Sequence, residues 1–436
     1  MTSATTIKMR VCAAEQFKES VSEPTPNTKY YLAYGRTISW ANDSSPDVAN
    51  TAVVSEYEVW RNMIGGKRIL GNDMCHVIPR NDWTTNTAYF AYDDMSTEMY
   101  EPANKFHIIT SDNNVYKCIS NNSGAVSTVE PLSVNPYALT ETSDGYVWKY
   151  MFTVSDADEM RFSTNEYVPV RFVETDDGSI QYVVQDEAIS GQINNIIVVN
   201  PGSGYSTTSN LMITITGDGT TATARATLSG NTIGSIVLTN YGYDYTFANV
   251  AISGGGGSGA TARAIISPYG GHGKNAIYEL GAKDIIINTS LDNTEEGVLP
   301  ATNDFRQISL IKDPLYKDGN VASNVAFIQA YTLTTVGTGD YSQDESVYQG
   351  TAASPSFYGR IVSWDSSNGI CCVINTIGTP SSQALIGSNT SIVRYVNNIR
   401  EKDFITNSGQ ILYINNMEPI TRSSDQAEDF RIVVKF

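Results

Sequence analysis

The spacing of apolar residues predicts one short helix in the N-terminal third of the chain. After the polar segment SSPD, apolar residues recur at steps of three and four positions, namely Val53, Val54, Tyr57, Trp60, Met63 and Ile64. This spacing places the side chains on one face of a helix. Gly65 and Gly66 follow, and we expect the helix to end there.

Elsewhere the pattern is typical of short strands. Apolar residues alternate with polar ones, or form short runs bounded by Gly, Pro, Asn and Asp, in KYYLAYGR (29–36), KFHIIT (105–110), VYKCI (115–119), GYVWKYMFTV (145–154), YVPVRFV (167–173) and IQYVVQ (180–185). Tyrosine and β-branched residues are abundant and only 17% of residues are charged, which favours strands and turns. We therefore predict a mainly β, multi-domain protein with a sandwich-like or barrel-like core, one short helix and inserted small β domains.

Residues 189–268 stand out as a separate module that contains an internal duplication. The window has no lysine and holds four charged residues, Asp218, Arg225, Asp244 and Arg263. INNIIVVNPGSGYS is followed forty residues later by IGSIVLTNYGYDYT, and the motif ATARA occurs twice, at 222–226 and 260–264. Because neither copy is large enough to bury an apolar face alone, we expect the two to pack together as one small β domain.

A second candidate insertion spans residues 331–394, where short strands alternate with Gly and Ser-Pro turns. This pattern predicts a compact barrel or sandwich of four or five strands. The predicted plan has a core made of 1–188, 269–330 and 395–436, interrupted by modules at 189–268 and 331–394.

Charge and targeting signals narrow the classes of partner. The formal net charge is −18 with a pI near 4.6, so a broad basic surface for binding nucleic acid is not expected. The first residues lack the apolar run of a signal peptide, and no stretch reaches the roughly 18 to 20 apolar residues of a membrane span. We expect a soluble protein made in the cytoplasm, with no membrane partner.

Few motifs in the sequence indicate catalysis or ligand binding, and we expect no catalytic residues, no metal and no cofactor. The three histidines have no metal-ligand spacing, and the five cysteines include no CxxC pair. GGGGSG at 254–259 lacks the following lysine and helix of a phosphate-binding loop, and GGHGKN at 270–275 reads as a hinge at the module boundary. A paired-carboxylate glycosidase stays open, although no acidic residue is distinguished by its context.

Tyr205 and Tyr245 occupy the same position in the two repeats. They could form a carbohydrate-binding platform, because a tyrosine offers an apolar face with a polar tip. The simpler interpretation, which we favour, is that each ring covers the tight glycine turn of its own repeat.

Several motifs, taken in series, give the chain a resemblance to a known family. These are NTKYYLAYGRTISW (27–40), HVIPRNDW (76–83), DGYVWKYMF (144–152), TNEYVPV (164–170), FRQISLIKDPL (305–315) and SGQILYINNMEPITRSSDQAEDFRIVVKF (408–436). In this order they resemble the baseplate wedge subunit of T-even-type contractile-tailed phages. The resemblance covers about half of the chain and leaves out the two β modules, which look like additions to a shorter core.

The resemblance implies a structural protein without catalytic activity. It would be a homodimer in the tail baseplate of a virion, bound to other wedge subunits, and would hold the baseplate together before contraction. The alternative function is a tail or fibre module that binds a host glycan through the inserted domains. Six residues in the shared motifs are candidate anchors, either of an interface or of the core: Arg80, Asp82, Trp83, Tyr146, Trp148 and Arg306.

Overall fold

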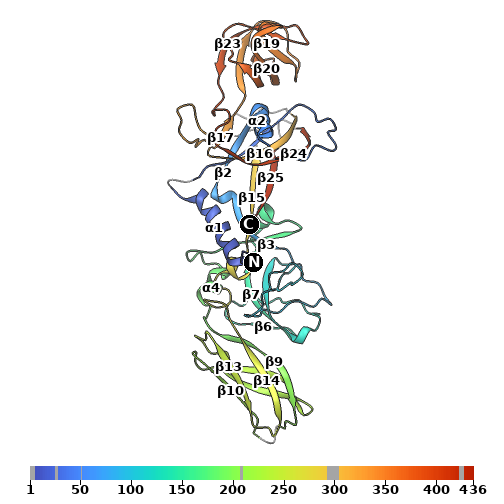
Figure 1. The fold of residues 1–436 in the computed structure, drawn as a ribbon, viewed down its shortest axis with the longest axis vertical. Coiled ribbons are helices and arrows are strands. Elements are labelled where there is room, and N and C mark those ends of the chain that lie inside the picture. The colour runs from blue at the N-terminus through green and yellow to red at the C-terminus, as the bar shows by residue number, and fades with distance from the viewer. Residues whose placement is uncertain (1–4, 25–27, 51, 207–209, 292–303, 422–426) are drawn as a thin grey trace. The chain divides into compact units, whose positions relative to one another are not determined.

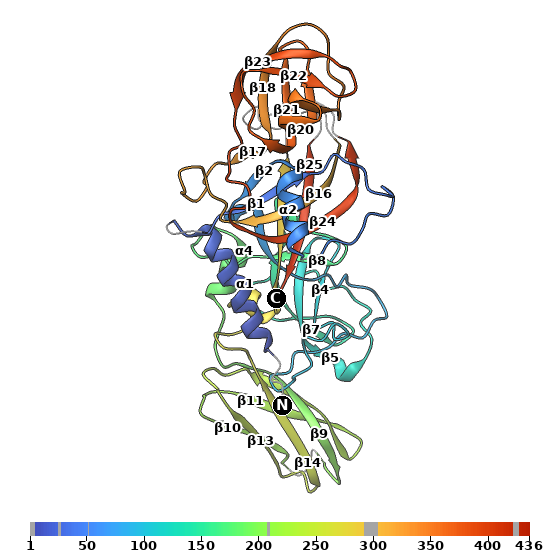
Figure 2. The same ribbon diagram turned by 45° about the horizontal axis from the view of Figure 1, so that its top comes forward.

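The computed structural model describes residues 5–24, 28–50, 52–206, 210–291, 304–421 and 427–436. These residues form two compact units, each built from separate stretches of the chain. The first unit consists of residues 1–15, 75–286 and 433–436, and the second of residues 16–74 and 287–432. The predicted mainly β fold is confirmed, since strands outnumber helices in both units (Figures 1 and 2).

The helices are few and mostly short. They are α1 (Ile7–Ser22), α2 (Val53–Asn62), α3 (Asp156–Phe162), α4 (Ile180–Asp186) and α5 (Ala276–Glu279). The predicted helix is α2, which buries Val59 and Trp60. Within the described ranges, no helix is both long and apolar enough to cross a membrane.

Three local predictions were wrong or incomplete. Gly65 and Gly66 do not end α2, because the helix stops at Asn62 and both glycines lie inside strand β2 (Met63–Ile69). IQYVVQ is the helix α4 and not a strand, and its N-cap, Ser179, accepts a hydrogen bond from the Tyr182 backbone N–H. The helix α1 was not predicted at all.

In the first unit, one sheet has the order β4-β5-β7-β6. Its strands are β4 (His107–Ile109), β5 (Asn114–Asn121), β6 (Thr140–Glu141) and β7 (Tyr146–Thr153). A four-stranded sheet that is not confined to the first unit has the order β25-β15-β3-β8, with strands β3 (Met74–Pro79), β8 (Tyr167–Val170), β15 (Asp284–Leu291) and β25 (Glu428–Lys435). The predictions of strands at KFHIIT, VYKCI, GYVWKYMFTV and YVPVRFV are therefore confirmed.

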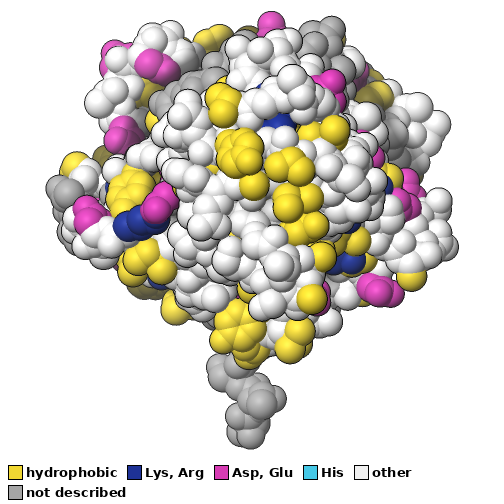
Figure 3. All heavy atoms as spheres, turned by 90° about the horizontal axis from the view of Figure 1, so that it is seen from above, with side chains coloured by type: hydrophobic (Ala, Val, Ile, Leu, Met, Phe, Trp, Pro, Cys, Tyr) yellow, Lys and Arg dark blue, Asp and Glu magenta, His cyan; other side chains and the backbone are white. Residues whose placement is uncertain are grey.

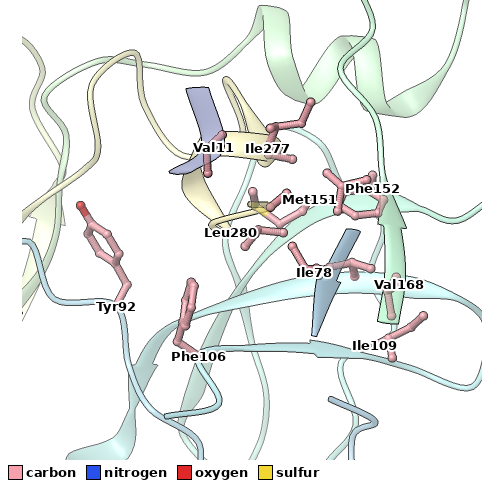
Figure 4. Close-up of a cluster of buried hydrophobic side chains, with 14 of the residues drawn as sticks. Val11, Ile78, Tyr92, Phe106, Ile109, Met151, Phe152, Val168, Ile277 and Leu280 are labelled. Carbon is pink, nitrogen blue, oxygen red and sulfur yellow. The ribbon is translucent and has the colours of Figure 1, made fainter. Parts of the chain in front are cut away.

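The main apolar core of this unit draws on segments that lie far apart in the sequence. Figure 4 shows Val11 of α1, Ile78, Met151 and Phe152 gathered with Ile277 in one cluster. Each of these side chains is at most 4% exposed. The N-terminal helix thus contributes directly to a core that is otherwise built from residues 75–286.

The duplicated region of the first unit forms interleaved strands. They are β9 (Ile193–Ser203), β10 (Met212–Gly217), β11 (Thr223–Ser229), β12 (Thr232–Asn240), β13 (Ala248–Ser253) and β14 (Ser258–Ile266). β9 of the first copy pairs with β14 of the second, whereas β12 of the second copy pairs with β11 of the first. The middle strands β10 and β13 pair with each other. The two copies therefore exchange strands, and one apolar cluster runs through both.

The second unit holds a five-stranded sheet and a closed barrel. The sheet has the order β17-β2-β1-β16-β24, and its remaining strands are β1 (Tyr30–Gly35), β16 (Asp304–Lys312), β17 (Ala326–Ile328) and β24 (Gln410–Thr421). The barrel has the order β18-β21-β20-β19-β22-β23. Its strands are β18 (Tyr331–Val336), β19 (Ser346–Thr351), β20 (Ser354–Asp365), β21 (Ile370–Gly378), β22 (Ala384–Gly387) and β23 (Val393–Arg400).

The barrel region contains six strands, whereas the sequence suggested four or five. Pairing of β18 with both β21 and β23 closes it, so the barrel has no open edge. Its interior is filled by Leu333, Val347, Phe357, Ile361 and Val373, each 0% exposed. The predicted domain boundaries, including the one at residue 394 inside β23, stay predictions.

Candidate functional site

The predicted anchors Arg80, Asp82 and Trp83 follow strand β3. The Arg80 guanidinium Nε donates a hydrogen bond to a carboxylate oxygen of Asp82 over 2.9 Å, and this pair lies at the surface. Trp83 is half-buried, and its indole N–H donates to the Ser127 hydroxyl over 3.2 Å. Arg80 and Asp82 therefore remain accessible to a partner, while Trp83 packs mainly against its own chain.

Tyr146 and Trp148 lie in the core of the β4-β5-β7-β6 sheet. Both are 0% exposed, and their rings stack with centroids 5.4 Å apart. The backbone N–H of Tyr89 donates a hydrogen bond to the Tyr146 hydroxyl over 3.2 Å. Because Trp83 packs against this same cluster, the structure brings three of the six predicted residues together as packing residues.

Arg306 lies in the second unit, on β16, and is also buried. Its guanidinium makes hydrogen bonds to both carboxylate oxygens of Asp43 and donates to the Thr37 carbonyl over 2.8 Å. The hydrogen bond from Arg306 lowers the pKa of Asp43 below its ordinary value. This network ties the 37–43 loop to β16, so Arg306 acts inside its own unit.

The first unit contains a buried ionic cluster that the sequence did not predict. The Lys117 ammonium lies 3.1 Å from one Glu279 carboxylate oxygen and 3.0 Å from Nδ1 of His272. All three side chains are at most 5% exposed. The ammonium also lies 4.1 Å from the centre of the Tyr92 ring, which favours its charged form. The one signal in the sequence was a lysine in the middle of the apolar strand VYKCI.

Burial and mutual contact determine how these groups titrate. Burial lowers the pKa of His272 to about 4, so the ring is neutral at pH 7 and its Nδ1 can accept a hydrogen bond from Lys117. Burial also lowers the pKa of Lys117, and Glu279 offsets part of that effect. Burial would raise the pKa of Glu279, but Lys117 and His272 outweigh it and the pKa falls below its ordinary value.

The GGHGKN segment supplies part of this cluster. The backbone N–H groups of Gly273 and Asn275 donate hydrogen bonds to the second Glu279 carboxylate oxygen over 2.8 and 3.2 Å. The loop therefore binds an anion, but the anion is a carboxylate of its own chain. The sequence suggested only a hinge here, but the loop also covers the buried Glu279 carboxylate.

The remaining candidates for metal or nucleophilic chemistry are dispersed. Four of the five cysteines are buried, Cys12 is half-buried, and all five are free thiols. His76 and His107 are buried, and each has a ring nitrogen within hydrogen-bonding distance of a backbone carbonyl. In the part of the chain that the structure describes, no three His, Cys, Asp or Glu side chains gather as metal ligands would.

An open cleft of about 470 Å³ lies in the first unit beside α3 and α4. Its polar side chains are already engaged in the fold. Asp158 forms two hydrogen bonds of 2.6 Å with Arg171, and Ser155 and Ser179 cap the two helices. The second carboxylate that lines the cleft, Asp177, accepts a hydrogen bond from the Ser179 backbone N–H over 2.9 Å, so both acidic side chains of the cleft are used within the fold.

Two comparisons show that part of the chain is similar in sequence to a phage baseplate protein. Residues 3–130 match the family model described as Bacteriophage T4, Gp8. The chain is also similar to the "Baseplate wedge protein gp8" of Enterobacteria phage T4, with 22% identity over 204 residues. That alignment covers 39% of this chain and 60% of the phage T4 protein, so the match spans less than two thirds of that relative.

Proposed function

We propose that the chain is a structural, non-catalytic subunit of the baseplate wedge of a contractile-tailed phage. The observation that carries this proposal is the match of residues 3–130 to the Gp8 family model, together with the similarity to a baseplate wedge protein. The proposed place of the chain is the tail baseplate of the virion. There it forms a homodimer and binds neighbouring wedge subunits, which holds the baseplate together before contraction.

The chemistry of the described residues supports a structural role. In the cleft, Asp158 forms an ion pair with Arg171, Asp177 accepts a backbone hydrogen bond, and Ser155 and Ser179 cap helices. Lys117 forms a buried ion pair with Glu279. We assign the buried Lys117–Glu279 pair the role of specifying one packing arrangement of the first unit. No bond is made or broken in the proposed function.

Helix α2 carries an apolar surface that suits a contact with another subunit. Val53, Val54 and Tyr57 are 61%, 65% and 51% exposed, although Val59 and Trp60 of the same helix are buried. A hollow of about 330 Å³ lies beside them, lined by Val54, Tyr57, Arg61 and Asn407. The face drawn in Figure 3 carries several groups of apolar side chains, and exposed apolar surface is normal for a folded protein. The exposed face of α2 is therefore our candidate contact, and it lies within residues 3–130.

Complementation tests the proposal. A phage that lacks this gene should produce tails with defective baseplates, and the wild-type chain supplied from a plasmid should restore them in electron micrographs. The double variant Val54→Asp/Tyr57→Asp should fold but fail to restore assembly. The control Val393→Asp, on the exposed side of β23, should restore it. Normal tails in the absence of the gene would refute the structural role.

A further inference from the structure

The turn that follows β12 exposes three aromatic side chains. Tyr241, Tyr243 and Phe247 are 42%, 46% and 55% exposed. The corresponding positions of the first repeat, forty residues earlier, hold Pro201, Ser203 and Thr207. The duplication therefore provides an internal comparison between a turn with exposed aromatic residues and a turn without them.

The two turns share their backbone geometry at the asparagine and the glycine with which each begins. In each, an asparagine side-chain oxygen accepts a hydrogen bond of 2.9 Å from a glycine N–H two residues later, at Asn200–Gly202 and Asn240–Gly242. The φ angles of these glycines are 62° and 64°. Because the first turn reaches this conformation with Pro and Ser, the scaffold does not require the aromatic residues of the second.

Tyr205 and Tyr245, and not the exposed aromatic residues, pack the interior of the two repeats. Tyr205 and Tyr245 are each 5% exposed, so neither can form the carbohydrate platform that the sequence suggested. Each ring touches the glycine of its own turn, and its hydroxyl accepts a hydrogen bond from the other copy, from the N–H of Ala260 or of Ala222. The three exposed rings are additional to this reciprocal packing.

The exposed area suits a small ligand better than a protein. An aromatic side chain has roughly 150–250 Å² of surface, and about half of each ring is exposed here, which gives roughly 300 Å² in all. A stable protein interface buries about 800 Å² on each partner. A turn of this size matches one or two sugar rings, whose C–H faces can stack on aromatic faces.

The charge of the turn disfavours an anionic ligand, because residues 241–247 include the carboxylate of Asp244 and no lysine or arginine. Of the four charged residues between positions 189 and 268, Arg263 is paired with Asp93 and Asp94, and Asp218 accepts hydrogen bonds from the Thr246 and Phe247 backbone. Arg225 is exposed on β11, outside the turn, where it lies opposite Val237 of β12. Asp244 lies inside the turn and is exposed, so its carboxylate can accept hydrogen bonds from hydroxyl groups.

We propose that the turn from Tyr241 to Phe247 binds a neutral saccharide. Its three aromatic side chains would stack on sugar rings, while the tyrosine hydroxyls and Asp244 would hydrogen-bond to the sugar hydroxyls. The site lies outside residues 3–130, so it goes beyond the proposed structural role and does not depend on it.

Affinity electrophoresis of the full chain tests this site. Native gels are cast with neutral polysaccharides (dextran, glycogen, mannan and laminarin) or with anionic alginate. The triple variant Tyr241→Pro/Tyr243→Ser/Phe247→Thr gives these three positions the residues found forty positions earlier, and the first turn folds with Pro201 and Ser203. Tyr243→Ser alone is a milder variant, and Tyr137→Ser removes a tyrosine that is 68% exposed elsewhere in the first unit.

The expected result is that at least one neutral polysaccharide retards the wild type and the Tyr137→Ser control equally. The triple variant should lose at least tenfold in affinity and Tyr243→Ser should lose part of it, with unchanged thermal unfolding. Retardation by none of the neutral polysaccharides, or by alginate alone, would overturn the proposal. So would equal retardation of the wild type and the triple variant, which would place binding elsewhere.

Discussion

Lys117, Glu279 and His272 show how the first unit accommodates charge in its interior. The ammonium and the carboxylate satisfy each other, and backbone N–H groups of the 273–275 segment complete the shell of the carboxylate. Taking either charged group out of water is costly, and their attraction offsets that cost only while both are present. The Lys117–Glu279 pair therefore holds the segment 270–279 against β5.

Removing one partner should be far more damaging than removing an exposed ion pair. Lys117→Met leaves the Glu279 carboxylate buried without its cation, and we expect a loss of about 3–5 kcal/mol in the free energy of unfolding. Urea denaturation followed by tryptophan fluorescence measures this. The matched control is Glu58→Gln, whose partner Arg61 lies 3.8 Å away at the surface, and it should change stability by less than about 0.5 kcal/mol. Similar losses for both variants would contradict the account.

Two buried histidines should make stability depend on pH. Burial lowers the pKa of His107 and of His272 to about 4, from 6.5. Between these values the unfolded chain binds protons that the folded chain does not, so stability falls as the pH falls. From pH 7 to pH 5 the loss should be roughly 2 kcal/mol for each histidine.

Urea denaturation at both pH values, on the wild type and on His272→Gln, checks this expectation. The variant should lose less stability than the wild type between pH 7 and pH 5, whatever its stability at pH 7. An equal change in the two proteins would show that His272 does not titrate in this range.

At the scale of elements, the sequence predicted the strands that alternate cleanly and failed where capping or small residues decide the structure. The runs around Tyr31 and Val115 were predicted correctly because their apolar residues are bounded by turn formers. IQYVVQ has a strand-like pattern, but the Ser179 cap starts a helix. In α1 the buried residues include Val11, Ala14 and Val21, and so weak an apolar stripe gave no clear helical signal.

The candidate site was predictable only in part, for a physical reason. Aromatic residues such as Trp148 stand out in a sequence, but burial decides whether they serve the core or an interface, and burial depends on the whole fold. Lys117 and Glu279 are 162 positions apart, and no local pattern shows that they meet. The exposed aromatic turn could be recognised only once the structure had shown that the two repeats share one backbone geometry.

That shared geometry predicts how the glycine turns respond to substitution. A Cβ at Gly202 would lie 2.5 Å from the Ala260 backbone nitrogen, and one at Gly242 would lie 2.7 Å from the Thr220 carbonyl oxygen. Gly230 has a similar φ of 61°, but a Cβ there would meet nothing within 4 Å. We expect Gly202→Ala and Gly242→Ala to cost about 3 kcal/mol or more, and Gly230→Ala about 1 kcal/mol.

Thermal unfolding of the three glycine variants measures the difference. Equal, small shifts for all three would mean that the turns do not pack closely against the strands of the opposite copy.

At the scale of the whole molecule, the chain passes between its two units four times, near residues 15, 74, 286 and 432. Neither unit is a continuous segment, so neither can be removed by a simple truncation. The strand-exchanged repeats and the closed barrel are different, since each is built from one continuous stretch of chain, 193–266 and 331–400. We propose that these two stretches were added to an existing core.

The most direct test of the proposed function is quantitative mass spectrometry of purified tails from the phage that encodes the chain. A homodimer in each wedge predicts about two copies of this chain for every copy of a wedge component present once. The chain should also disappear from tails whose baseplates have been removed. Absence from the particle, or a threefold ratio typical of a trimeric fibre, would contradict the baseplate assignment.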